Sequence, residues 1–152
     1  MNDTLPPAPA GALPAHLGWR LLALLYDAIL NIALWFAVSG VALAVVPGHS
    51  AFAPWSPGQL ALWALCWSVS GLYAVVSWRG IGQTLGMRPW RLKVLGADGR
   101  IAGAPALCLR YAVATVSLAA AGLGFAWSLV DRERRTWHDI ASRTVLVRLP
   151  PR

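Results

Sequence analysis

Charged side chains are scarce in this sequence, and one long stretch has none at all. Asp, Glu, Lys and Arg make up 12% of the 152 residues, and none of them occurs between Asp27 and Arg79. Hydrophobic residues make up 57%, which excludes an ordinary soluble domain. A helix needs about 20 apolar residues to cross a membrane, so the uncharged stretch predicts membrane helices.

Three apolar segments predict an all-α integral membrane fold. Residues 21–46 and 60–78 are each long enough to span, and residues 106–130 form a third segment that either spans or re-enters the membrane. We expect a flexible Pro-rich tail over residues 1–18, a membrane domain over 19–148 and a short C-terminal end over 149–152.

Acidic residues are also few, 6 against 13 basic ones, which leaves a net charge of +7. Nucleic acid is not the expected partner, because the cations are unevenly placed along the chain. None lies in residues 47–59, whereas the loop after the second segment is rich in them. The positive-inside rule then places loop 79–105 in the cytoplasm and loop 47–59 outside. Four of the loop cations are expected to contact anionic lipid headgroups: Arg88, Arg91, Lys93 and Arg100.

The C-terminal region carries six arginines, which a plain third span would place outside. Residues 91–95 and 143–149 read as short strands, and lone strands are marginal unless they find partners. Pairing requires both strands on one side. We therefore favour a re-entrant or bent third segment, with Gly122 and Gly124 as places to bend, over a straight span.

Residues that commonly support catalysis or metal binding are sparse. The two cysteines, Cys66 and Cys108, stand outside any Cys-x-x-Cys or Cys/His cluster. The phosphate-loop frame is absent, and His138 beside Asp139 has no nucleophile in view. We expect no enzymatic activity, no cofactor and no metal site.

Asp27 is an acid within an apolar run. A carboxylate there costs about 2.5–3.5 kcal/mol and is normally paired, protonatable or functional. Arg20 lies on the same helical face seven residues earlier, and Asn31 follows one turn later. The first membrane helix therefore begins with a polar stripe.

Four short motifs, in order, resemble the RDD family of mainly bacterial multi-pass membrane proteins. They are Arg20-Leu-Leu-Ala-Leu-Leu-Tyr-Asp27, Gly82-Gln83-Thr84-Leu85-Gly86, Leu92-Lys93-Val94 with Ala97-Asp98-Gly99, and Trp137-His138-Asp139-Ile140-Ala141. The resemblance covers about residues 17–148. It implies a bacterial inner-membrane protein whose signature residues, one arginine and two aspartates, are Arg20, Asp27 and Asp139.

The Gly82-Gln83-Thr84-Leu85-Gly86 motif predicts a sharp turn at the membrane surface, formed through Gly82, Gln83, Thr84 and Gly86. A lysine commonly follows this run in the family, whereas Met87-Arg88-Pro89 stands here, which preserves a cation one residue later. The resemblance implies the fold more firmly than an activity.

Two functions remain open. In the first, the protein is an accessory or assembly subunit whose intramembrane charges are neutralised, with Arg110 pairing Asp27 and Arg20 pairing Asp139. In the second, it is a transporter component, with cation/proton antiport through a protonatable Asp27 beside Asn31. Since two or three helices enclose little space, the transporter component requires a homo-oligomer or another membrane protein as partner.

Overall fold

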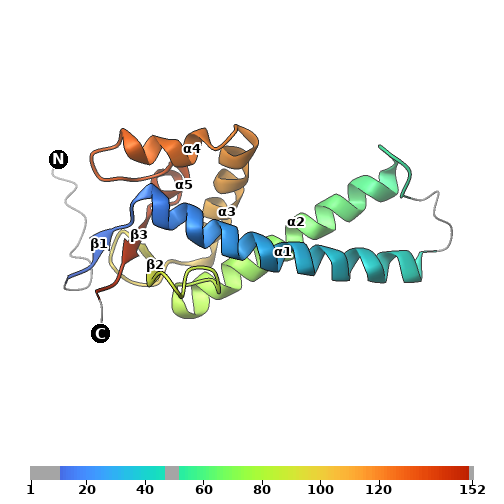
Figure 1. The fold of residues 1–152 in the computed structure, drawn as a ribbon, viewed down its shortest axis with the longest axis horizontal. Helices are drawn as coiled ribbons and strands as arrows, with labels where there is room; N and C mark the ends of the chain where they lie inside the picture. Colours follow the sequence, from blue (N-terminus) through green and yellow to red (C-terminus); the bar gives the residue numbers. More distant parts are fainter. Residues whose placement is uncertain (1–10, 47–51, 151–152) are drawn as a thin grey trace.

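A computed structural model describes residues 11–46 and 52–150. Two long helices, α1 (Leu17–Val45) and α2 (Pro57–Ile81), project together from a smaller head (Figure 1). Both are long and apolar enough to cross a membrane. The two expected spans are therefore confirmed, and α1 begins earlier than the expected residue 21.

Local sequence signals set the ends of α2. Ser56 caps its first turn by accepting a hydrogen bond from the Gln59 amide at 3.2 Å, and Pro57 occupies the first position. The helix ends at Gly82, whose φ of +77° is the left-handed conformation that favours glycine. The chain turns sharply at this point, as the motif predicts.

The third apolar segment is broken rather than straight. Helix α3 (Ala104–Ala119) is followed by α4 (Leu123–Ala126) and the 3-10 turn η2 (Trp127–Leu129), and the two parts meet at 108°. Gly122, with a φ of +80°, lies at the break. Gly124 packs directly against Ser117 of α3, where a Cβ would collide. The expected bend at these two glycines is confirmed.

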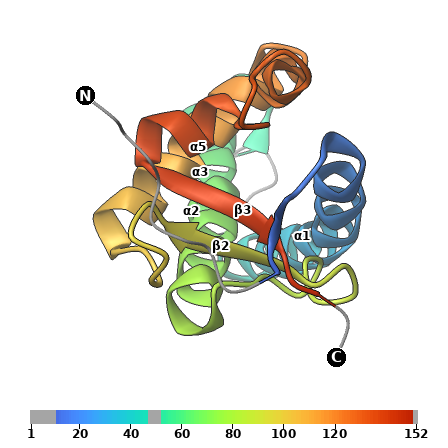
Figure 2. The same cartoon turned by 90° about the vertical axis from the view of Figure 1, so that its left-hand side faces the viewer.

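A small antiparallel sheet lies in the head, in the order β1 (Leu13–Pro14), β3 (Thr144–Arg148), β2 (Leu92–Gly96). Figure 2 shows β3 running between the other two strands. Leu92 pairs with Arg148 and Gly96 with Thr144, so the expected strands do pair. The third segment thus begins after β2 and ends before β3, two strands that pair with each other, as expected of a re-entrant or bent segment.

The expected flexible tail over residues 1–18 is wrong for its last part, while residues 1–10 lie outside the described residues. Leu13 and Pro14 form β1, and the Ala15 amide donates to the Leu146 carbonyl at 3.0 Å. Pro14 is tolerated because β1 is an edge strand, where the sheet does not need a hydrogen bond from that backbone nitrogen. Ala15 has no exposed surface.

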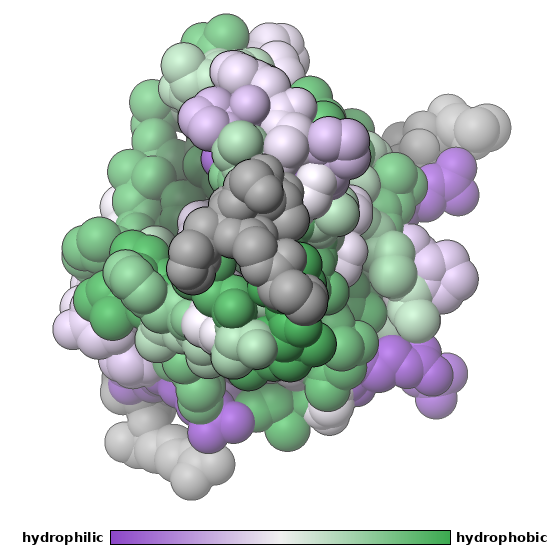
Figure 3. Space-filling model, turned by 90° about the vertical axis from the view of Figure 1, so that its right-hand side faces the viewer, coloured by the Kyte–Doolittle hydropathy of each residue, from purple (hydrophilic) through white to green (hydrophobic). Residues whose placement is uncertain are grey.

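The hydrophobic core lies where the starts of the helices meet the sheet. Its buried members come from α1 and the segment before it, the loop after α2, strands β2 and β3, and α3 and the segment before it: Ala15, Ala23, Met87, Leu92, Val94, Ala102, Leu107 and Leu146. A last short helix, α5 (Trp137–Ser142), packs beside α3. The far halves of α1 and α2 contribute nothing to this core, and hydrophobic side chains cover most of that end of the molecule (Figure 3). Cys66 is buried and Cys108 is exposed, and both are unpaired.

Candidate functional site

A buried carboxylate between two arginines is the centre of the head. Asp139 of α5 accepts from Arg20 of α1 at 2.7 Å, and its other oxygen accepts from Arg110 of α3. All three are at most 5% exposed. Residues separated by more than 100 positions in the chain thus meet at one carboxyl group.

The sequence around Asp139 positions its carboxylate. Thr136 caps α5 by accepting from the Asp139 amide, and the Asp139 carboxylate accepts from the Thr136 amide at 3.1 Å. This reciprocal capping box directs the side chain back toward the helix start. The spacing Thr136-x-x-Asp139 is visible in the sequence, and it is the signal that could have identified Thr136 as part of the site.

Backbone and hydroxyl oxygens take up the remaining arginine donors. Arg20 donates to the carbonyls of Ala15 at 3.0 Å and Arg134 at 3.1 Å. Arg110 donates to the Thr144 hydroxyl at 2.6 Å, and its guanidinium lies 5.5 Å from the centre of the Trp78 ring. Two cations and one anion are therefore buried, and each of them makes hydrogen bonds to neighbouring groups.

The arginines hold the carboxyl group in its charged form. Burial alone would raise the pKa of Asp139, but the neighbouring charges of Arg110 and Arg20 outweigh it and keep that pKa below its ordinary value. Burial, with the charge of Arg110, lowers the pKa of the adjacent His138 to about 3. His138 is therefore neutral near pH 7 and packs against the Phe125 ring.

The ion-pair predictions have mixed outcomes. The pairing of Arg20 with Asp139 is confirmed, whereas the pairing of Arg110 with Asp27 is wrong, because Arg110 binds Asp139 and Thr144. The chain after the α3–α4 bend brings α5 alongside α3, which places Asp139 next to Arg110. Asp27 faces a different neighbour.

That neighbour is the turn that follows α2. The Asp27 carboxylate accepts from the Tyr73 hydroxyl at 2.9 Å, from the Gly86 amide at 2.9 Å and from the Thr84 hydroxyl. All three donors are uncharged, and among the described residues no arginine or lysine pairs with Asp27. The turn motif thus forms one wall of the Asp27 site, and Tyr73 is a site residue that the sequence does not single out.

Two other residues of the turn motif have structural roles. Gln83 donates to the Leu92 carbonyl at 2.7 Å and so ties the turn to β2. Gly82 supplies the left-handed cap of α2. Asn31 donates to the Asp27 backbone carbonyl at 2.8 Å, not to its carboxylate. The buried Oδ1 of Asn31 has no hydrogen-bond partner among the described residues.

A cavity of about 350 Å³ lies between α1, α2 and α3, next to this site. Asp27, Asn31, Tyr73 and Arg110 contribute polar groups to it. Most of its remaining lining is apolar or aromatic and includes Ala28, Trp35, Trp67, Ala114, Tyr111 and Leu118. Over residues 11–46 and 52–150, no group of three or more His, Cys, Asp and Glu side chains is placed to hold a metal ion.

The four cations expected at the lipid surface lie at different positions along the chain around β2. Arg88 and Arg91 precede β2, Lys93 lies within it, and Arg100 follows the turn beyond its end. Arg88 and Arg100 are exposed, and the other two are half-buried. None of the four side chains has an acidic partner among the described residues.

A comparison with protein-family models agrees with the motifs. The RDD family model matches residues 14–143, which include Arg20, Asp27 and Asp139. Neither the curated proteins nor the solved structures gave a match to this chain. With two membrane helices, a buried arginine–aspartate cluster and a family match over most of its length, the chain belongs to the RDD family.

Proposed function

We propose that the protein is a small accessory or assembly subunit of the bacterial inner membrane, without catalytic activity of its own. The observation that carries this proposal is the double ion pair of Asp139 with Arg20 and Arg110. It joins α1, α3 and α5 at one buried point. Asp139 is paired within the chain to both arginines, which leaves the cluster with one net positive charge.

Such a cluster favours an architectural role. Removing one member of a buried ion pair is costly, yet the intact pair often adds little net stability and instead specifies an arrangement. Here the arrangement it specifies is the attachment of the head to the start of α1. A rigid head on two membrane helices is suited to docking against other membrane components.

The long helices leave room for a partner within the membrane. None of the most apolar stretch of α1 is buried inside the protein, and only 22% of that of α2 is. Ile32 and Phe36 of α1 are 50% and 76% exposed. We propose that a second copy of the chain or another membrane protein covers this surface, with loop 47–59 outside and loop 79–105 in the cytoplasm.

Cross-linking in native membranes tests this assignment. With Cys66 and Cys108 replaced by Ala, an Ile32→Cys variant should form a discrete disulfide-linked adduct under mild oxidation. The matched control is Ala74→Cys, since Ala74 is only 8% exposed. No adduct from Ile32→Cys, or equal adducts from both variants, would contradict a specific partner surface on α1.

A transporter component is the second candidate, and the surroundings of Asp27 favour it. This carboxylate has only neutral donors and lines the cavity with Asn31, whose Oδ1 lacks a partner among the described residues. A carboxylate and an amide oxygen beside a membrane cavity can bind a proton or a cation in turn. A second copy would enlarge the enclosed space.

Proteoliposomes that contain only this protein separate the two candidates. The accessory role predicts no cation-dependent proton flux above that of empty liposomes. Flux from the native chain that is lost in Asp27→Asn, and retained in the exposed-site control Glu133→Gln, would favour the transporter and contradict the first proposal.

A further inference from the structure

The outer edge of the head, where β3 ends beside the start of α1, carries an arginine without an acidic partner. The Arg148 guanidinium lies 4.1 Å from the centre of the Trp19 ring, a cation–π contact. Among the described residues, no side chain or carbonyl accepts a hydrogen bond from it, and its Nε is buried without a partner. Arg148 is half-buried, whereas Arg20 and Arg110 are buried and both bind Asp139.

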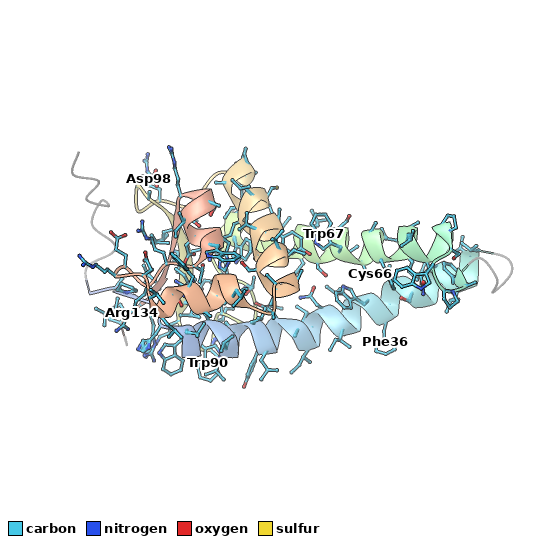
Figure 4. The ribbon with its side chains drawn as sticks, turned by 90° about the horizontal axis from the view of Figure 1, so that it is seen from above. Phe36, Cys66, Trp67, Trp90, Asp98 and Arg134 are labelled. Atoms are coloured by element: carbon cyan, nitrogen blue, oxygen red, sulfur yellow. The ribbon has the colours of Figure 1, made fainter. Side chains whose placement is uncertain are left out.

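Aromatic rings surround this arginine. Trp90 lies 5.3 Å from Trp19, and Tyr26 meets the edge of Trp90 at 5.8 Å. The indole N–H of Trp90 is also buried without an acceptor among the described residues. Figure 4 shows Trp90 beside the first turns of α1, on the side away from α2. Tryptophan and tyrosine rings of this kind concentrate at the level of the lipid headgroups.

A second arginine lies on the adjoining segment of the chain. Arg91 precedes β2, and its carbonyl accepts from the Leu149 amide at 2.9 Å, so its backbone adjoins the end of β3 that carries Arg148. Arg91 also has no ion pair among the described residues. Among the described residues, two arginines without anions thus lie on adjoining segments, and the guanidinium of Arg148 contacts an aromatic ring at the start of α1.

We propose that Arg148, Arg91, Trp19 and Trp90 form a binding site for the phosphate group of one anionic phospholipid. Guanidinium groups bind phosphate oxygens in a forked geometry, and the unpaired N–H donors of Arg148 and Trp90 can be satisfied by the same oxygens. The exposed face of Tyr26 lies deeper along α1 and would contact the upper acyl chain. This site is separate from Asp27 and does not depend on the proposed function.

Native mass spectrometry of the full-length protein in detergent provides the test. The protein is titrated with phosphatidylglycerol or with phosphatidylcholine of the same acyl chains, and the affinity of the first bound lipid is measured. Arg148→Gln should weaken phosphatidylglycerol binding by about fivefold, the equivalent of about 1 kcal/mol for one cation near the membrane surface. Phosphatidylcholine binding should not change.

Arg143→Gln is the matched control, because it removes the same charge at an exposed position beyond the other end of β3. It should bind phosphatidylglycerol as the native chain does. Equal weakening by Arg143→Gln and Arg148→Gln would mean diffuse attraction and would overturn the site, as would equal native binding of the two lipids. Arg91→Gln decides the question if Arg148→Gln does not fold, and it too should lose about fivefold.

A competition experiment tests whether the site binds a lipid or free inorganic phosphate. Millimolar inorganic phosphate should leave the phosphatidylglycerol adduct unchanged, because the aromatic rings contribute to binding only when an acyl chain is attached. Displacement of the lipid by inorganic phosphate would assign the site to a soluble anion and overturn the lipid proposal.

Discussion

The amide of Gly86 donates a hydrogen bond to the Asp27 carboxylate at 2.9 Å, and a Cβ built on Gly86 would lie 2.7 Å from the Asp27 Cγ. The backbone of the turn after α2 therefore lies so close to α1 that no side chain larger than a hydrogen atom fits at position 86. Glycine is needed here because of this contact, not because of an unusual backbone angle. The same contact makes the Asp27 site sensitive to a single methyl group.

Gly86→Ala is expected to destabilise the protein by about 1–3 kcal/mol, since the turn must withdraw and leave Asp27 short of a donor. Thermal unfolding in detergent measures the loss. Gly80→Ala, in exposed α2 with open space around the added Cβ, is the control and should be neutral or slightly stabilising. Equal melting temperatures for the two variants would contradict the close contact.

Asp139→Asn is expected to cost about 3–5 kcal/mol, because it leaves two buried arginines without their anion. The double variant with Arg110→Gln should lose less than the sum of the two single variants. Glu133→Gln removes the anion of an exposed pair with Arg135 and should cost at most about 1 kcal/mol. Chemical or thermal unfolding in detergent reports all of these, and additive losses would argue against the shared site.

Asp27→Asn and Arg110→Gln should instead be additive within about 0.5 kcal/mol, since the two side chains share no hydrogen-bond partner. The measurement is a double-mutant cycle on the unfolding free energy. A coupling well above that limit would restore a direct interaction between the two charges.

Stability should fall as the pH is lowered from about 6.5, the ordinary pKa of histidine, toward about 3, the pKa of buried His138. In this window the unfolded chain binds a proton that the folded chain excludes, so the unfolding free energy falls by about 1.4 kcal/mol per pH unit. Arg110 and Arg20 face His138 and oppose its protonation, while Asp139 favours it. His138→Gln should flatten the melting-temperature profile over this range, and His16→Gln, at an exposed position, is the histidine control. An unchanged slope in His138→Gln would show that another group is responsible.

The paired strands predict the labelling pattern of single cysteines. In a background with Cys66 and Cys108 replaced by Ala, cysteines at exposed Asp98 and Ala141 should react alike with an impermeant thiol reagent in intact cells. A cysteine at exposed Ala53 should show the opposite behaviour. Different accessibility at Asp98 and Ala141 would contradict a third segment that returns to its own side.

The sequence by itself determined the class of the protein and most of its elements. Whether a segment enters a membrane depends on its own composition, so the uncharged stretch after Asp27 was sufficient to predict α1 and α2. Alternation and turn residues identified β2 and β3, and Gly122 identified the break after α3. The strand β1 before α1 could not be predicted in this way. It is only two residues long, and it forms because β3 is available to pair with it.

Only the tertiary structure decided which charges meet. Two aspartates and two arginines near one membrane surface allow several pairings, and each satisfies the same local rules. Because the chain bends after α3, α5 packs against α3, and Asp139 lies within ion-pair distance of Arg20 and Arg110. Asp27 is left to Tyr73, Thr84 and Gly86, whose approach depends on how the turn after α2 packs on α1. Which side chain a carboxylate meets depends on how its helix is rotated and how deep it lies relative to the neighbouring helices. The spacing of residues within a single segment carries no information about either.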